Sequence, residues 1–93
     1  MGLEIITLNK LPLNECGKIE KINCKGNIKR RLLDLGLVKG TKIVPILVSP
    51  VKDPRAFLVR GSIVAIREEE AENIEVTLWI NYIKIILDLK ISI

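Results

Sequence analysis

Glycine and proline residues recur at short intervals along this chain and divide it into short segments. Six glycines and four prolines are spread over 93 residues, and most of them fall between apolar runs. Gly and Pro are the strongest local signals of turns, and strands are typically shorter than helices. The spacing therefore predicts a small, mainly β fold, and a chain of this length has no room for a second independent domain.

The composition supports strands and a reducing compartment. Hydrophobic residues make up 48% of the chain but aromatic residues only 3%, so the core must be built from Ile, Leu and Val, which favours strands. The net charge of +4 permits attraction to acidic partners but is weaker than most nucleic-acid-binding proteins need. Cys16 and Cys24 match neither a CxxC redox pair nor half of a zinc ribbon, which indicates a reducing environment.

Neither end of the chain predicts export or a membrane span. Glu4 places a negative charge where a signal peptide needs basic residues. The apolar carboxyl end is interrupted by Lys84, Asp88 and Lys90, so no apolar stretch is long enough to cross a bilayer. We therefore expect a soluble, cytoplasmic protein.

Residues 27–35 carry the clearest helical pattern. Their apolar residues recur at the spacing of one helix face. These residues are Ile28, Leu32 and Leu35. Asn27 can accept a hydrogen bond from a free amide as the N-cap, and Gly36 can take the left-handed conformation that ends a helix in a Schellman motif. In that motif Leu37 folds back onto the helix.

The rest of the chain up to residue 77 is typical of short strands joined by turns. Gly40 and Gly61 stand where a turn and a bend need conformational freedom. Pro45 has no amide proton, so its strand must lie at an edge or bend at a bulge. The predicted strands are residues 17–22, 42–48, 56–60, 62–67 and 75–77, with turns at 11–15, 38–41 and 49–54 and a short acidic helical turn at 68–73.

Beyond this region, residues 83–93 are apolar at every odd position, which is a strand pattern. A helix that includes Trp79, Tyr82 and Ile86 would also have an apolar face, but the many β-branched isoleucines favour the strand. We predict that this tail adds a strand to an exposed sheet edge, within the chain or across a homo-oligomer.

Two stretches of the sequence resemble the FeoA family. Residues 29–41, KRRLLDLGLVKGT, are similar to the basic helix of that family, its Leu-Gly-Leu ending and its turn glycine. Residues 59–67, which contain VRG followed by IVAIR, are similar to a later part of the pattern, and residues 8–22 to its opening strand. The resemblance covers about residues 8–77.

The resemblance implies a small SH3-like β-barrel, with residues 1–77 as the barrel and residues 78–93 as an apolar extension. It also implies an adaptor that works beside FeoB, a membrane transporter of ferrous iron with a cytoplasmic GTPase domain, and that is recruited through it to the inner face of the membrane. Similar barrels form the carboxyl-terminal domains of iron- and manganese-dependent repressors. Asn14 departs from the family, which often places a glycine in this turn.

The residues themselves give little support to catalysis or to a metal site. The chain has no histidine, the usual general base near neutral pH, so we expect no enzyme, no catalytic residue and no cofactor. Glu68, Glu69 and Glu70 are consecutive and would point in different directions on a helix, which is typical of a solvated face. Cys16 and Cys24 are interpreted as buried or half-buried small hydrophobic residues rather than ligands of a divalent transition metal.

The densest run of positive charge lies on the predicted helix. It consists of Lys29, Arg30 and Arg31, to which Lys25, Lys39 and Lys42 could add. Such a run is usually a solvated helix face; docking of a protein is the alternative, and nucleic acid the less favoured one because aromatic stacking residues are missing.

The corner after the helix is the second candidate for a docking surface. We expect Leu35 to lie in the core, and Leu37 and Val38 to stay partly exposed beside tight turns, where clustered aliphatic residues often mark a contact surface. The predicted partner-binding residues are Lys29, Arg30, Arg31, Leu37, Val38 and Lys39. The alternative functions are a metal-responsive interaction module and a nucleic-acid-binding barrel.

Overall fold

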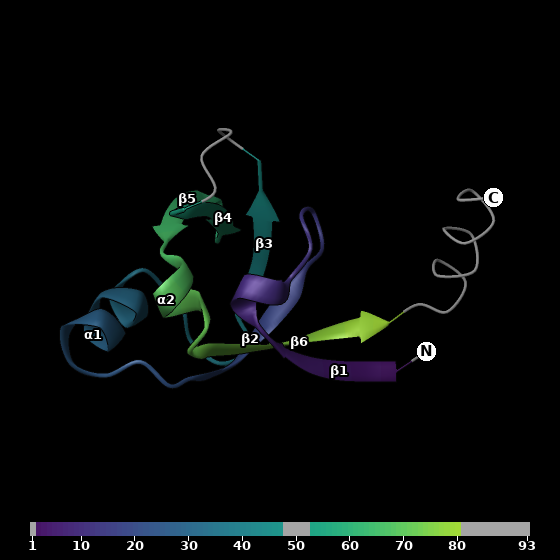
Figure 1. The fold of residues 1–93 in the computed structure, drawn as a ribbon, viewed down its shortest axis with the longest axis horizontal. Helices are drawn as coiled ribbons and strands as arrows, with labels where there is room; N and C mark the ends of the chain where they lie inside the picture. The colour runs from purple at the N-terminus through teal and green to yellow at the C-terminus, as the bar shows by residue number, and fades with distance from the viewer. Residues whose placement is uncertain (1, 48–52, 81–93) are drawn as a thin grey trace.

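The fold is a single twisted antiparallel sheet with two short helices at one side (Figure 1). The computed structural model describes residues 2–47 and 53–80. Its strands are β1 (Gly2–Thr7), β2 (Gly17–Ile22), β3 (Lys42–Ile46), β4 (Arg55–Val59), β5 (Ser62–Ile66) and β6 (Ile74–Ile80). Its helices are the 3-10 turn η1 (Leu8–Lys10), α1 (Gly26–Asp34) and α2 (Glu68–Ala71). The prediction of a mainly β fold with one short helix and a short acidic turn is confirmed.

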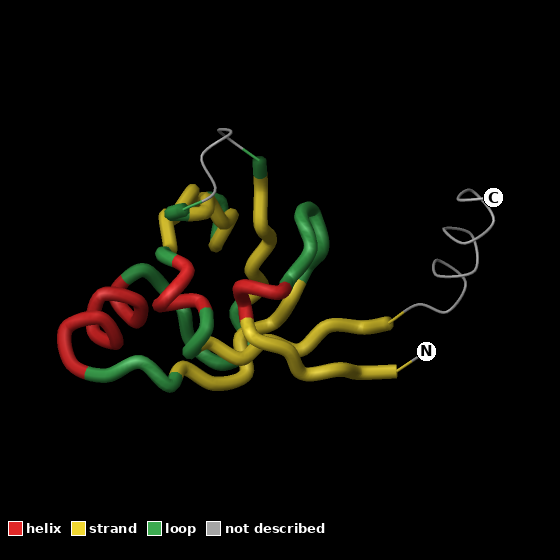
Figure 2. Tube along the Cα trace, in the orientation of Figure 1, coloured by secondary structure: helices red, strands yellow, loops and turns green. Residues whose placement is uncertain are grey.

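The strands are hydrogen-bonded in the order β1-β6-β2-β3-β4-β5, so β1 and β5 are the two ends of the sheet. β1 and β6 form a long two-stranded ribbon that extends away from the helices, as the strand colouring of Figure 2 makes plain. The sheet curls around an apolar core of aliphatic side chains and Phe57. The prediction of an aliphatic core is therefore confirmed.

Helix α1 ends as predicted but begins differently. The Gly36 amide donates to the Leu33 carbonyl at 2.9 Å and the Leu37 amide to the Leu32 carbonyl at 3.0 Å, the two bonds of a Schellman motif. At the other end the N-cap residue is Lys25, which makes no side-chain cap bond. Asn27 lies inside the first turn, so the prediction that it caps the helix is wrong: Gly26, with φ +61°, turns the chain into the helix before Asn27 is reached.

The turns occur where glycine was expected. Gly40 has φ +91°, and the pair Arg60 and Gly61, with φ +51° and +80°, joins β4 to β5 in a two-residue hairpin. Positive φ at both central residues is the signature of a type I′ turn, whose twist matches that of the flanking strands. Asn14 has φ +67°, a left-handed conformation. Asparagine tolerates this conformation better than most residues, and glycine would also suit the position.

Pro45 lies in a part of β3 that β2 does not reach. β3 pairs with β2 only at Ile43 and Lys42, whereas its pairing with β4 continues to Ile46. The carbonyl of Pro45 accepts the Asn14 amide at 2.8 Å on the side away from β4. Because the nitrogen and carbonyl of one strand residue point the same way, the missing amide proton of Pro45 costs no ladder bond. β3 is not an edge strand, however, and the prediction of an edge or a bulge at Pro45 is wrong for the sheet as a whole: Pro45 is accommodated because β2 stops short of it.

Two features of the chain ends differ from the predictions. The opening strand of the sheet is β1, ahead of residue 8, whereas residues 8–22 contain η1, a turn and β2. β1 pairs with β6, some seventy positions later, over its whole length. β6 also runs to Ile80, past the predicted end at residue 77. The predicted tail strand at residues 83–93, and part of the hairpin loop at 49–54, lie outside the described residues.

Replacing Gly36 by alanine should lower the free energy of unfolding by about 1–2 kcal/mol, because φ +95° is strained for any residue with a Cβ. The new methyl group would also meet the Arg60 side chain at 3.2 Å. Urea denaturation would measure the change. An Asp34→Ala variant at the exposed end of the same helix is the control, and an equal loss in both variants would contradict this reading.

Candidate partner-binding surface

Helix α1 presents its positive charge to solvent. Lys29 and Arg30 are exposed, and Leu32 is the one residue of the helix that is buried. Ile28, predicted to share the buried face, is 43% exposed. The helix therefore contacts the sheet along a narrow stripe, and a basic face remains accessible to a partner.

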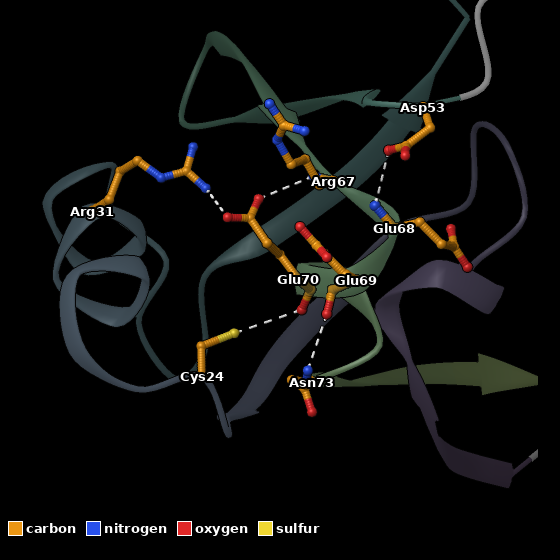
Figure 3. A network of polar contacts seen from close by, with 8 residues as sticks. All are labelled: Cys24, Arg31, Asp53, Arg67, Glu68, Glu69, Glu70 and Asn73. Atoms are coloured by element: carbon orange, nitrogen blue, oxygen red, sulfur yellow. Dashed lines mark hydrogen bonds and ion pairs between the residues drawn. The ribbon is translucent and has the colours of Figure 1, made fainter.

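Arg31 differs from its basic neighbours because it is paired. Its guanidinium donates to the Glu70 carboxylate, which lies in α2 and is nearly buried (Figure 3). The second carboxylate oxygen of Glu70 accepts the Arg67 backbone amide at 3.0 Å at the start of α2. The interpretation of Glu68, Glu69 and Glu70 as one solvated face is thus wrong for Glu70, because α2 turns this side chain inward toward α1.

The electrostatics of Glu70 reflect these contacts. Burial raises its pKa, but the hydrogen bonds from the Arg67 amide and the Arg31 guanidinium, together with the charges of both arginines, outweigh burial. The net effect is a pKa below the ordinary value of a glutamate. Glu70 therefore stays ionised near neutral pH and holds α1 against α2.

The two cysteines occupy different environments. Cys24 is buried, and its thiol donates to the Glu70 carbonyl at 3.6 Å. Burial raises the pKa of Cys24, and the nearby negative charge of Glu70 raises it further. Cys16 is exposed, so the prediction that both are buried or half-buried is right for Cys24 and wrong for Cys16. Both are free thiols.

The corner after α1 reverses the expected roles of its leucines. Leu37 is fully buried, whereas Leu35 is 40% exposed and Val38 is 40% exposed. The two Schellman bonds fold Leu37 back over Leu32, and Leu35, at the C-cap, points away. Leu37 is consequently a core residue instead of a partly exposed one, while the exposure of Val38 is confirmed.

A groove of about 300 Å³ lies between α1 and β2. Its lining includes the buried Ile19 and Leu37 and the more accessible Leu33 and Val38. Lysines surround this apolar lining: Lys21, Lys29 and Lys39. Lys39 lies 3.4 Å from the Glu20 carboxylate, an exposed pair that contributes little stability. We call this region the α1–β2 groove.

The groove brings together some of the predicted residues and not others. Lys29, Val38 and Lys39 line it, and so does the buried Leu37. Arg31 instead pairs with Glu70 of α2. Lys21 and Leu33 were missed as candidates. The strand pattern of residues 17–22 gives no sign that Lys21 lies beside α1, because that neighbourhood depends on how the helix packs.

Other site types find no support in the part of the chain that the structure describes. No group of three or more His, Cys, Asp and Glu residues there could hold a metal ion. No helix within residues 2–47 and 53–80 is long and apolar enough to cross a membrane.

The FeoA domain model matches residues 6–78. The chain belongs to the FeoA family. This FeoA-family chain is 30% identical over 71 residues to the "Fe(2+) transport protein A/Fe(2+) transporter FeoB fusion protein" of Porphyromonas gingivalis. The match covers 76% of the chain but only 8% of that fusion protein.

Solved structures of FeoA proteins share the fold. The solution structure of FeoA from Chlorobium tepidum has a TM-score of 0.74 at 29% identity and covers 81% of this chain and 71% of its own. FeoA of Stenotrophomonas maltophilia, solved with zinc and described as a prokaryotic SH3 domain protein, has a TM-score of 0.65 at 33% identity. The match covers 76% of this chain and 88% of the S. maltophilia chain. The predicted SH3-like fold is thus confirmed. The repressor IdeR of T. acidophilum also matches, with a TM-score of 0.72 at 25% identity over 85% of this chain and 36% of its own.

Proposed function

We propose that this chain is a non-enzymatic accessory of ferrous iron uptake that binds the cytoplasmic part of a FeoB-type transporter and modulates its activity. The observation that carries the proposal is the P. gingivalis fusion protein, in which FeoA-type and FeoB-type sequences form one chain. Fusion keeps two partners at a high effective concentration, which favours an interaction between them.

The α1–β2 groove is the surface we assign to this contact. Its apolar lining can take up an aliphatic side chain of a partner, and its lysines suit carboxylates beside it. Arg30 extends the positive charge along α1, where its side chain is exposed. Apolar contacts at the centre would supply most of the affinity, while the lysines would guide orientation and the rate of association.

A co-purification experiment tests both the partnership and the surface. The double variant Lys29→Glu/Val38→Asp should lower recovery of the chain with the tagged transporter by about tenfold, because it reverses a charge and places a carboxylate at the apolar lining. Lys10→Glu/Leu13→Asp is the matched control: it makes the same two kinds of change at exposed residues outside the groove, and Leu13 is 45% exposed, close to Val38.

The outcomes separate the two parts of the proposal. Recovery of the folded groove variant at the wild-type level would show that another surface makes the contact. Failure of the wild-type chain to co-purify with the transporter at low salt would instead contradict the partnership. GTP hydrolysis by the transporter, measured with and without the chain, tests modulation.

A further inference from the structure

Within residues 2–47 and 53–80, strand β5 is an edge of the sheet with no strand paired to its outer side. It is the last strand in the order β1-β6-β2-β3-β4-β5, and its residues Ser62–Ile66 include no charged side chain and no proline. β1, at the other end, carries Glu4. Natural sheets usually guard their edges with charges, prolines or bulges, because an unguarded strand can pair with another chain.

The hairpin fixes which backbone groups of β5 face outward. Val59 and Ser62 close a two-residue turn, so they form a hydrogen-bonded pair, and hydrogen-bonded pairs alternate along the two strands. Val64, opposite Phe57, therefore points its backbone groups at β4, whereas those of Ile63 and Ala65 point away from it. Among the described residues, neither Ile63 nor Ala65 makes a backbone hydrogen bond outside its own strand pair.

The same two residues are apolar on the outer face of the sheet. Ile63 is 63% exposed and lies beside Leu58, and Ala65 is exposed and lies beside Ala56. The side chains of Val64 and Ile66, which alternate with them along the strand, are buried in the core. The edge thus offers one large and one small apolar side chain next to two sets of outward backbone groups.

We propose that β5 pairs antiparallel with β5 of a second copy of this chain, around a two-fold axis at Val64. This register overlaps the whole strand and places Ile63 opposite Ala65 of the second copy, and Ala65 opposite its Ile63. Both are pairs of outward-facing residues, so each can exchange two N–H···O=C bonds. A large side chain then meets a small one at both positions, and the two outer faces form one continuous apolar surface.

A second copy fits this edge because the contact is self-complementary. A two-fold contact needs a patch that matches itself, and it closes after two copies instead of growing into a fibre. The same register directs Arg60 of one copy toward the start of α2 in the other, where Arg67 and Glu68 are both exposed and the Glu68 carboxylate already accepts the Asn9 side-chain amide at 2.9 Å. Charge therefore does not decide the contact, which rests on the outward backbone groups and the apolar side chains of Ile63 and Ala65.

Analytical ultracentrifugation of the full chain over a range of concentrations tests the dimer. The wild-type protein should pass from monomer to dimer as concentration rises, and Ile63→Lys should weaken dimerisation at least about tenfold, because it charges an apolar edge contact. Ile5→Lys is the matched control, since Ile5 is 56% exposed on β1 at the opposite edge. A wild-type chain that stays monomeric at all concentrations, or a dimer that survives Ile63→Lys, overturns the proposal.

Disulfide trapping tests the register. In a Cys16→Ser background, Ile63→Cys and Ala65→Cys chains should form a disulfide-linked dimer when mixed, because the paired Cα atoms would lie about 5.5 Å apart. Each variant alone should form little disulfide-linked dimer. In this register the new cysteine of Ile63→Cys would face Ala65 of the second copy, and that of Ala65→Cys would face Ile63. Equal trapping in the mixture and in either variant alone, or no trapping in any sample, would overturn the register.

Discussion

Replacing Leu37 by alanine should lower the free energy of unfolding by about 2–5 kcal/mol, the cost of removing a fully buried leucine side chain from a packed core. For a chain of 93 residues this is a large share of the total stability. The variant should show a lower midpoint in urea denaturation with little change in slope.

Val38→Ala is the matched comparison, because Val38 is the next residue in the chain and is 40% exposed. Its substitution should cost less than about 1 kcal/mol. If Leu37→Ala were as mild as Val38→Ala, then Leu37 would not be packed as described. The comparison also explains why Leu37 is not used to test partner binding. A Leu37 variant that lost binding could have done so because its fold was destabilised.

The corner shows what a sequence pattern can and cannot determine. The Schellman ending of α1 could be predicted, because Gly36 and Leu37 directly follow an amphipathic helical pattern. The burial that results was assigned to the wrong leucine. Helix periodicity favoured Leu35, but the chain leaves the helix after Asp34, and the fold-back that the motif itself requires buries Leu37 instead. The Schellman motif itself predicts that Leu37, and not Leu35, is the buried residue.

Other differences arise from contacts between distant parts of the chain. The strand segments of β4 and β5 were predicted, but Gly61 was assigned to a bend between them, whereas Arg60 and Gly61 form a two-residue turn that pairs the strands locally. β1 was missed, since it depends on pairing with β6 near the other end of the described chain. Glu70 was assigned to a solvated face for the same reason. All three residues of the Glu68–Glu70 run are equally polar in the sequence. Only the packing of α1 against α2 determines that the carboxylate of Glu70 meets Arg31.

Replacing Glu70 by alanine should lower the free energy of unfolding at pH 7 by about 1–3 kcal/mol, the usual loss for a buried hydrogen bond to a charged group. The variant removes the acceptor of both the Arg31 guanidinium and the Arg67 amide. The larger loss typical of a fully buried ion pair does not apply, because the Arg31 side chain is 46% exposed and water can solvate it once it is unpaired. Glu69→Ala, at an exposed neighbour in the same helix, should have a much smaller effect.

The pH dependence of this loss identifies the ionised carboxylate as its cause. The pKa of Glu70 is lower in the folded chain than the ordinary value of about 4.3, so the unfolded chain binds its proton first as pH falls. The stabilisation is thus complete above that ordinary value and is lost as pH drops through the lower folded-state pKa. Denaturation of the wild type and of Glu70→Gln at pH 7 and pH 3 should show a difference that shrinks at pH 3. A difference that stays constant between the two pH values would mean that the side chain acts through its shape alone, and that α1 is held to the sheet mainly by the buried Leu32.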